Sequence, residues 1–156
     1  DPVVASAALG FAKKARNFAE ELDVPLAFVE KRRVTNIGGS SQTLSLIGDT
    51  KNRDVIPVDD EISTGGSIAQ AVNIIKECGA RDIYVVFVHP VFSANASEKM
   101  SALPVKQFIT TDTIPIPPEK AALFGDRLKV LSVSELLGEV IVRANEGRSV
   151  GEMFNE

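Results

Sequence analysis

The stretch that decides the fold is Val58-Asp59-Asp60-Glu61-Ile62-Ser63-Thr64-Gly65-Gly66-Ser67. It lies between an apolar run, residues 54–58, and a helix-like pattern over residues 67–78. A strand that passes through a tight turn into a helix is the unit from which α/β folds are built. Its apolar character suits a parallel strand, because parallel strands are buried on both faces.

Strand and helix patterns alternate on both sides of this stretch. We expect further strands at residues 2–6, 25–29, 82–89, 105–110 and 128–131, and further helices at residues 10–22, 95–103 and 134–145. Pro57 lacks an N–H donor, so we expect a local irregularity in its strand. Residues 31–48 begin with three cations and include a glycine pair, which predicts a mobile loop with hairpin character near residues 44–47. This order predicts an α/β fold with a mostly parallel sheet flanked by helices.

Composition narrows the class of protein. The 156 residues suit a single domain. The net charge of −4 argues against nucleic-acid binding, and no apolar run approaches the ~20 residues of a membrane span. The single cysteine, Cys78, excludes an internal disulfide, favours a reducing, cytoplasmic compartment and is expected to be a small core residue. Because the chain does not begin with methionine, we expect it to be part of a longer protein.

The turn has the chemistry of a phosphate cradle. Gly65 and Gly66 let backbone N–H groups approach an anion, and the following helix offers unpaired N–H groups and the positive end of its dipole. Ser63, Thr64 and Ser67 add hydroxyl donors. A Walker-type loop is excluded, because no lysine follows the glycines.

Two acids precede the turn. Asp59 and Asp60 would repel a phosphate beside them, so sugar hydroxyls or a bridging cation are their natural partners. Ribose 5-phosphate has a phosphate at one end and vicinal hydroxyls at the other, and therefore fits both halves of the motif. The competing interpretation is an ordinary turn that the two aspartates merely cap.

The motif resembles the phosphoribosyl pyrophosphate motif shared by phosphoribosyltransferases and ribose-phosphate pyrophosphokinases. Other stretches, in the same order along the whole chain, resemble the pyrophosphokinases specifically. They are Phe28-Val29-Glu30-Lys31-Arg32-Arg33, Val88-His89-Pro90-Val91-Phe92-Ser93, Thr110-Thr111-Asp112-Thr113-Ile114-Pro115, and residues 132–137 with 146–150.

The resemblance implies a type I phosphoribosyltransferase-like fold over residues 1–156. This would be the C-terminal half of an enzyme about twice as long, which transfers the diphosphoryl group of ATP to the 1-hydroxyl of ribose 5-phosphate. By resemblance, Lys31 and Arg33 are catalytic cations, Asp59, Asp60 and residues 63–67 bind ribose 5-phosphate, and Mg²⁺ takes part. It also implies homo-oligomers, with dimers assembled into hexamers. Without the N-terminal half and its ATP-binding residues, the chain is expected to be inactive alone.

Two positions depart from the family pattern. Ala8 stands where the family has an aspartate that binds magnesium, so the metal ligands stay unknown. Ser63 stands where the family usually has an acid. Two alternatives therefore stay open: a phosphoribosyltransferase that uses phosphoribosyl pyrophosphate, and a non-catalytic regulatory homologue. His89 is interpreted as a structural histidine and the basic helix face of Lys13, Lys14 and Arg16 as solvated.

Overall fold

The computed structural model describes residues 1–36 and 39–154, with the backbone alone for residues 9 and 31–43. The described part contains a seven-stranded sheet in the order β3-β2-β1-β4-β5-β6-β7. The strands are β1 Pro2–Ser6, β2 Leu26–Asn36, β3 Gly39–Ile47, β4 Asp54–Glu61, β5 Tyr84–His89, β6 Gln107–Thr111 and β7 Leu128–Leu131. The helices are α1 Ala12–Glu21, α2 Gly66–Glu77, α3 Ala96–Ser101, α4 Pro118–Ala122 and α5 Ser134–Glu146, with short 3-10 turns η1 Leu9–Phe11, η2 Gly125–Arg127 and η3 Gly151–Phe154.

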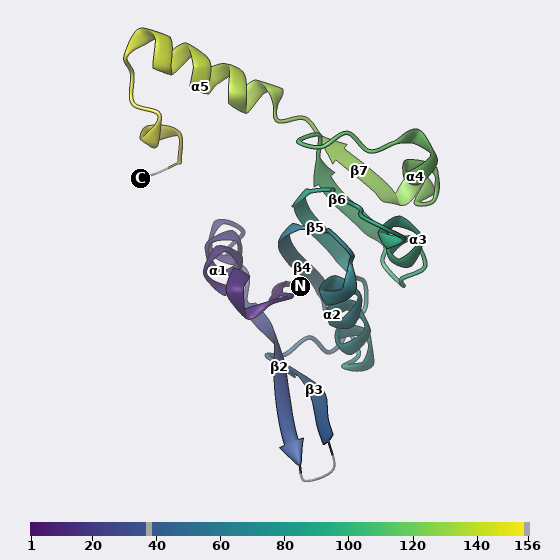
Figure 1. Cartoon of the computed structure of the whole chain (residues 1–156). Coiled ribbons are helices and arrows are strands. Elements are labelled where there is room, and N and C mark those ends of the chain that lie inside the picture. Colours follow the sequence, from purple (N-terminus) through teal and green to yellow (C-terminus); the bar gives the residue numbers. More distant parts are fainter. Residues whose placement is uncertain (37–38, 155–156) are drawn as a thin grey trace.

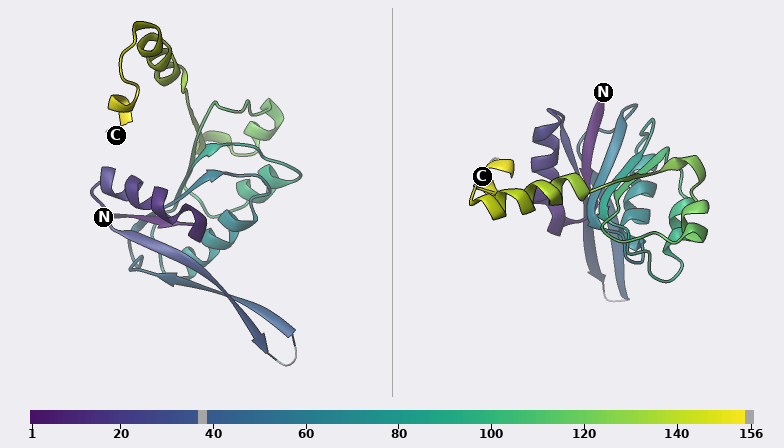
Figure 2. Two further views of the ribbon diagram at one scale, coloured as in Figure 1. Left: turned by 60° about the vertical axis from the view of Figure 1, so that its left-hand side comes forward. Right: turned by 90° about the horizontal axis from the view of Figure 1, so that it is seen from above.

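Neighbouring strands pair in parallel, except β2 with β3, which are antiparallel. The predicted α/β class with a mostly parallel, helix-flanked sheet is therefore confirmed. From the β1–β4 pair the strand order runs outward in opposite directions. Right-handed crossovers consequently place α1 on one face of the sheet and α2, α3 and α4 on the other (Figures 1 and 2). Ligands bind beyond the carboxyl ends of the strands where the order reverses, which here is at β1 and β4.

Apolar side chains fill both faces beside this point. The larger cluster lies between the sheet and α2, α3 and α4, and four of its phenylalanine rings form a chain in which successive centroids lie 5.8, 5.5 and 5.0 Å apart: Phe87, Phe92, Phe124 and Phe108. The smaller cluster lies under α1 and comprises Val4, Ala15, Ala19 and Val58. The helices are thereby anchored to the sheet around the carboxyl end of β4.

Pro57 interrupts the pairing of β4 with β5. The Val55–Ile83 bridge stands apart from the ladder, which resumes at Val58 and Val86. Proline has no N–H to donate, which explains the gap. The predicted local irregularity is confirmed, while β4 pairs with β1 along residues 54–58.

Two expectations are corrected. Residues 31–36 and 39–47 are not a loop, because β2 and β3 pair from Phe28 with Ile47 to Asn36 with Gly39 as one long hairpin. Residues 37–38, part of the same loop prediction, lie outside the described residues. Cys78 is exposed rather than in the core, because α2 ends at Glu77 and its buried side is Ile68, Ala71, Val72 and Ile75.

Candidate functional site

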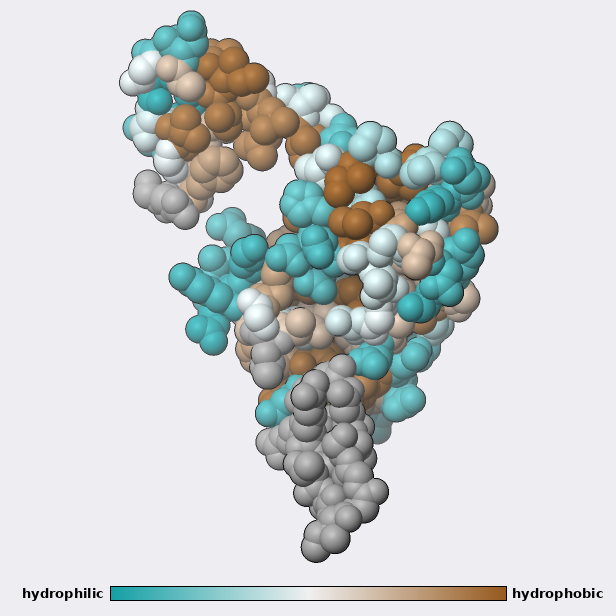
Figure 3. Space-filling model, in the orientation of Figure 1, coloured by the Kyte–Doolittle hydropathy of each residue, from teal (hydrophilic) through white to brown (hydrophobic). Residues whose placement is uncertain are grey.

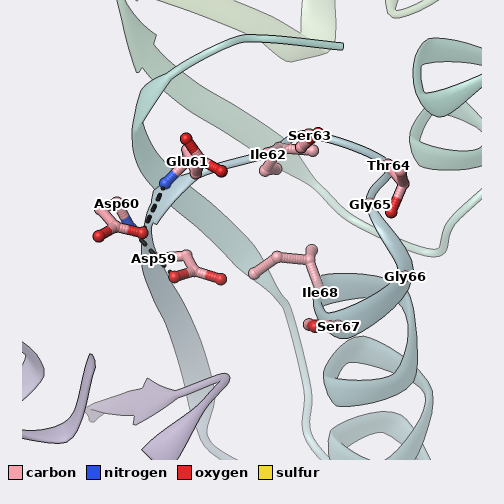
Figure 4. Close-up of a pocket in the computed structure, with 10 residues that line it drawn as sticks. All are labelled: Asp59, Asp60, Glu61, Ile62, Ser63, Thr64, Gly65, Gly66, Ser67 and Ile68. Carbon is pink, nitrogen blue, oxygen red and sulfur yellow. Dashed lines mark hydrogen bonds between the residues drawn. The ribbon is translucent and has the colours of Figure 1, made fainter. Parts of the chain in front are cut away.

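The loop between β4 and α2 forms a cavity at the carboxyl edge of the sheet. The cavity has a volume of about 240 Å³ and is lined by residues 59–68, which include all seven residues predicted to bind ribose 5-phosphate. Figure 4 shows Asp59, Asp60 and Glu61, at the end of β4, on one side and the start of α2 on the other. The arrangement therefore joins a carboxylate-rich wall to a helix N-terminus.

Gly65 gives the loop its shape. Its φ of 72° lies in the left-handed region, where a side chain is disfavoured. A Cβ at this position would also lie 2.7 Å from Cε of Met100, a fully buried residue of α3. Because α2 begins at Gly66, the N–H groups of its first turn have no partner within the helix and are available to an anion. Thr64 and Ser67 are exposed beside them.

Residues 92–94, which follow β5, hold the β4–α2 loop in place through hydrogen bonds. The amide of Phe92 donates to the carbonyl of Ile62 at 2.9 Å, and the amide of Ser93 donates to the carbonyl of Ser63 at 3.0 Å. The hydroxyls of Ser63 and Ser93 lie 3.0 Å apart in a further hydrogen bond. Ser63 thus lines the cavity, and its hydroxyl also contacts Ser93.

The supporting segment itself has unusual backbone geometry. Phe92 and Ala94 have φ values of 44° and 50°, in the left-handed region that residues with a side chain rarely adopt. Lys99 of α3 adds another contact, because its Nζ donates to the carbonyl of Thr64 at 3.0 Å. The sequence singled out Phe92 and Ser93 only as part of a stretch that resembles the family, and their contacts with the loop were missed together with Ala94 and Lys99, since no periodic pattern links these residues to a loop about 30 positions earlier.

The carboxylates differ in their environment. Asp59 is half-buried, and Asp60 and Glu61 are exposed. Burial raises the pKa of Asp59 to about 6; its hydrogen bond from the amide of Asp60 lowers the pKa, and the charge of Asp60 raises it. The amide of Glu61 donates in the same way to Asp60, at 3.0 Å. Asp59 is therefore mostly ionised at neutral pH and able to accept hydrogen bonds from sugar hydroxyls.

Comparison with known proteins identifies the family. The family described as "Phosphoribosyl synthetase-associated domain" matches residues 34–155. The chain belongs to this family. It is 41% identical to the ribose-phosphate pyrophosphokinase of Caldanaerobacter subterraneus subsp. tengcongensis, over 99% of this chain and 47% of the relative. The corresponding enzyme of Nostoc sp. is 42% identical, over 99% and 46%.

A solved structure agrees with the phosphoribosyl synthetase family. The crystal structure of phosphoribosylpyrophosphate synthetase from Mycobacterium smegmatis matches with a TM-score of 0.83 and 35% identity, covering 94% of this chain and 46% of that one. This likeness confirms the fold and the relationship that the sequence motifs predicted. The chain spans about half the length of the relatives that it matches.

The resemblance to the phosphoribosyl synthetases also singles out Lys31, Arg33 and position 8, which lie outside the cavity lining. Lys31 and Arg33 lie in β2, but their side chains are outside the described part of the structure. Ala8 follows β1, and its carbonyl accepts hydrogen bonds from the hydroxyl of Ser6 at 2.7 Å and the amide of Phe11 at 3.0 Å. Since the residue is alanine, position 8 offers no carboxylate to a cation.

Lys14 and His89 lie near the site, and each has a partner within the chain: Lys14 contacts a residue of the cavity itself, and His89 a residue beyond β6. Lys14 lies 3.6 Å from Asp60 in an exposed ion pair, which contributes little to stability. The Nδ1 atom of His89 forms a 2.9 Å hydrogen bond with the hydroxyl of Thr113. This contact between strand ends agrees with the structural interpretation of His89. Among the described residues, no helix is long and apolar enough to cross a membrane.

Proposed function

We propose that the chain is a single domain, residues 1–156, that forms the ribose 5-phosphate-binding C-terminal half of a ribose-phosphate pyrophosphokinase. The enzyme would transfer the diphosphoryl group of ATP to the 1-hydroxyl of ribose 5-phosphate, giving phosphoribosyl pyrophosphate and AMP. The observation that carries the proposal is the β4–α2 cavity, which joins a helix N-terminus to a half-buried aspartate. The names of the relatives support the same activity.

Each end of ribose 5-phosphate has a counterpart in the cavity. The phosphate would accept hydrogen bonds from the first amides of α2 and from the hydroxyls of Thr64 and Ser67. The ribose hydroxyls would donate to the carboxylates of Asp59 and Asp60. Because Gly65 fixes the turn between these two groups, the loop binds the phosphate and the diol in one orientation.

Catalysis would come mainly from the positioning of the two substrates and from the stabilisation of negative charge on the migrating group. In diphosphoryl transfer, negative charge on the migrating group must be stabilised while the attacking hydroxyl is held in line. We propose that Lys31 and Arg33 on β2 provide cations for that charge. Phosphate suits both residue types, since arginine binds it bidentately and lysine acts as a point charge.

The carboxylates of the cavity are suitable ligands for magnesium. Mg²⁺ in phosphoryl-transfer sites is usually held by one or two carboxylates together with substrate phosphates. Asp59 and Asp60 supply two adjacent carboxylates at the cavity, so they would hold the ion, and when bound it would neutralise substrate charge. Ala8 adds no ligand.

The family resemblance also suggests the cellular compartment, the oligomeric state and the domain composition of the enzyme. We propose a cytoplasmic homo-oligomer built from dimers assembled into hexamers, with ATP contacts supplied in part by an N-terminal half. This chain alone would then bind ribose 5-phosphate without turning it over. Ala8 favours a second candidate, a non-catalytic regulatory homologue that keeps the sugar-phosphate site.

Calorimetric titration of this chain with ribose 5-phosphate tests the binding step. We expect a Kd between micromolar and millimolar, roughly −8 to −4 kcal/mol, and binding of unphosphorylated ribose at least about tenfold weaker, which is about 1.4 kcal/mol. Absence of ribose 5-phosphate binding would remove the basis of the proposal.

Product analysis on the full-length protein separates the candidate functions. Release of AMP from ATP in the presence of ribose 5-phosphate supports the pyrophosphokinase. Release of pyrophosphate from phosphoribosyl pyrophosphate with a nucleobase supports a phosphoribosyltransferase. Binding without either product supports the regulatory homologue.

A further inference from the structure

Lys120 of α4 donates a hydrogen bond to the segment that holds the β4–α2 loop. Its Nζ atom lies 2.6 Å from the carbonyl oxygen of Phe92, in a short, charge-assisted bond. Hydrophilic side chains over α3 and α4 face solvent (Figure 3), whereas Lys120 is half-buried. Within the part of the chain that the structure describes, Lys120 forms no ion pair. Its charge therefore acts mainly on this peptide group.

Phe124 contacts Phe92 from the same part of the chain. It follows Lys120 by four residues, and its ring stacks on the ring of Phe92 with the two centroids 5.5 Å apart. Both phenylalanine side chains are buried. Phe92 has a φ of 44°, in the left-handed region, so its backbone keeps this conformation only because its surroundings hold it. The carbonyl and the ring of Phe92 are thus both held by residues 120–124.

The peptide group that Lys120 contacts also holds the ligand loop. In a trans peptide the carbonyl and the following N–H point in opposite directions, and no peptide bond of the described residues is cis. The carbonyl of Phe92 and the amide of Ser93 belong to one such group. Lys120 binds one end of it, and at the other end the Ser93 amide donates to the carbonyl of Ser63 at 3.0 Å. Rotation of this single group would break both hydrogen bonds.

The same alternation leads from Ser63 to the cavity. The carbonyl of Ser63 shares a peptide group with the amide of Thr64, which therefore points away from residues 92–94. Thr64 lines the cavity (Figure 4), and no hydrogen bond among the described residues uses its amide. Three donors thus follow one another, from Lys120 through Ser93 to Thr64. Because each hydrogen bond in such a chain polarises the next, the charge of Lys120 makes the Thr64 amide a stronger donor.

The charge of the cavity explains why a stronger donor matters. Residues 59–68 line it and carry three carboxylates and no lysine or arginine. A phosphate at the start of α2 is therefore repelled by its surroundings unless positive groups nearby offset them. Lys99 acts on the loop in the same way as Lys120, since its Nζ donates to the carbonyl of Thr64 at 3.0 Å. Both ammonium groups thus reach the loop through its backbone.

We propose that Lys120 is a positioning residue of the phosphate site. It fixes and polarises the peptide groups 92–93 and 63–64, and so presents the Thr64 amide to the phosphate of the ligand. Lys120 does not line the cavity, so it acts through the backbone and not by touching the ligand. This proposal rests on the proposed function, which places a sugar phosphate in the β4–α2 cavity.

Replacement of Lys120 by methionine tests the proposal in the full-length protein. Lys120→Met removes the charged donor and keeps an unbranched side chain. Calorimetry should show binding of ribose 5-phosphate and of inorganic phosphate weakened by about fivefold each, because both ligands use the Thr64 amide. Without any ligand, the Ser93 amide should exchange its hydrogen at least about tenfold faster, because its peptide group is free to rotate. Lys120→Arg restores a charged donor and should bring both properties back towards the wild type.

Lys76→Met is the matched control. Lys76 also donates to backbone carbonyls, at 3.2 and 2.9 Å, but these carbonyls follow the far end of α2 from the cavity. The control therefore loses the same kind of bond, and it should leave both affinities and the exchange of Ser93 unchanged. If Lys120→Met does not fold, Lys120→Gln takes its place with the same expectations, since it also removes the charge.

The outcomes separate this proposal from the proposed function. Unchanged exchange of Ser93, an equal effect of the control, or faster exchange with unchanged affinity would each overturn the role of Lys120. A wild-type protein that binds inorganic phosphate but not ribose 5-phosphate contradicts the proposed function, and the phosphate affinity of the variants then decides the role of Lys120. A wild-type protein that binds neither ligand overturns both.

Discussion

Replacing Asp59 with asparagine should stabilise the fold and weaken the ligand complex. Burial raises the pKa of Asp59 to about 6, against roughly 3.9 in an unfolded chain. Because the native state then binds the proton more tightly, stability falls as pH rises from about 4 to about 6 and stays at that lower level above. The full shift corresponds to roughly 2.9 kcal/mol, which solvent at the half-buried side chain reduces to about 1–2 kcal/mol.

Urea unfolding should reveal this difference directly. At pH 7.5 we expect Asp59→Asn to raise the free energy of unfolding by about 1–2 kcal/mol, and at pH 4 the two proteins should differ little. Asp126→Asn, an exposed residue in η2 away from the cavity, is the control and should change nothing. A less stable Asp59→Asn variant at pH 7.5 would refute the assignment of a buried, costly carboxylate.

Ligand affinity should move in the opposite direction. Loss of a charge-assisted hydrogen bond from a ribose hydroxyl costs about 1.5–3 kcal/mol, or roughly 10- to 150-fold in Kd. Between pH 7 and pH 5 the ionised fraction of Asp59 falls about tenfold, so the affinity ratio of the wild type to Asp59→Asn should fall equally. The ratio is needed because the ligand phosphate itself titrates near 6. A ratio that is constant with pH would refute the role of Asp59 in binding.

Three further variants test the loop and its support. Gly65→Ala should destabilise the protein by about 2–3 kcal/mol in urea unfolding, because of its left-handed backbone and the nearby Met100; a neutral change would contradict the loop geometry. Ala94→Gly should stabilise it by about 0.5–1 kcal/mol, as relief of left-handed strain exceeds the entropy cost of glycine; destabilisation would argue against that strain. Lys99→Met should weaken ribose 5-phosphate binding by about 1 kcal/mol, or about fivefold in calorimetry, through loss of its bond to Thr64; unchanged affinity would show that the bond does not position the loop.

The shape of the β4–α2 loop was predictable because its residues are consecutive, while its binding of phosphate stays a prediction. Gly65, the start of α2 and the two aspartates are consecutive in the sequence, and the structure places all of them around one cavity. The irregularity at Pro57 was predictable for the same reason, since a missing N–H is a property of one residue.

What escaped prediction depends on distant parts of the chain. Ser93 and Lys99 reach the loop only because β4 and β5 are adjacent and α3 follows β5, which no spacing rule expresses. The β2–β3 hairpin was mistaken for a loop because its cations and glycines outweighed the β-branched residues between them. Cys78 was assigned to the core by residue type, although it lies past the last turn of α2.

The β1–β4 pairing has a consequence for how the chain folds. Every other neighbouring pair in the sheet joins consecutive strands, so those contacts close short segments, whereas β1 must wait for β4 across two intervening strands. The chain thus divides into one unit over residues 1–47 and a second over residues 54–131, which meet along this seam. Because the residues that line the β4–α2 cavity and those that hydrogen-bond to its loop all belong to the second unit, we expect ligand binding to appear when that unit forms, before the two units meet. Stopped-flow refolding in which ribose 5-phosphate binds only after β1 is protected would contradict that order.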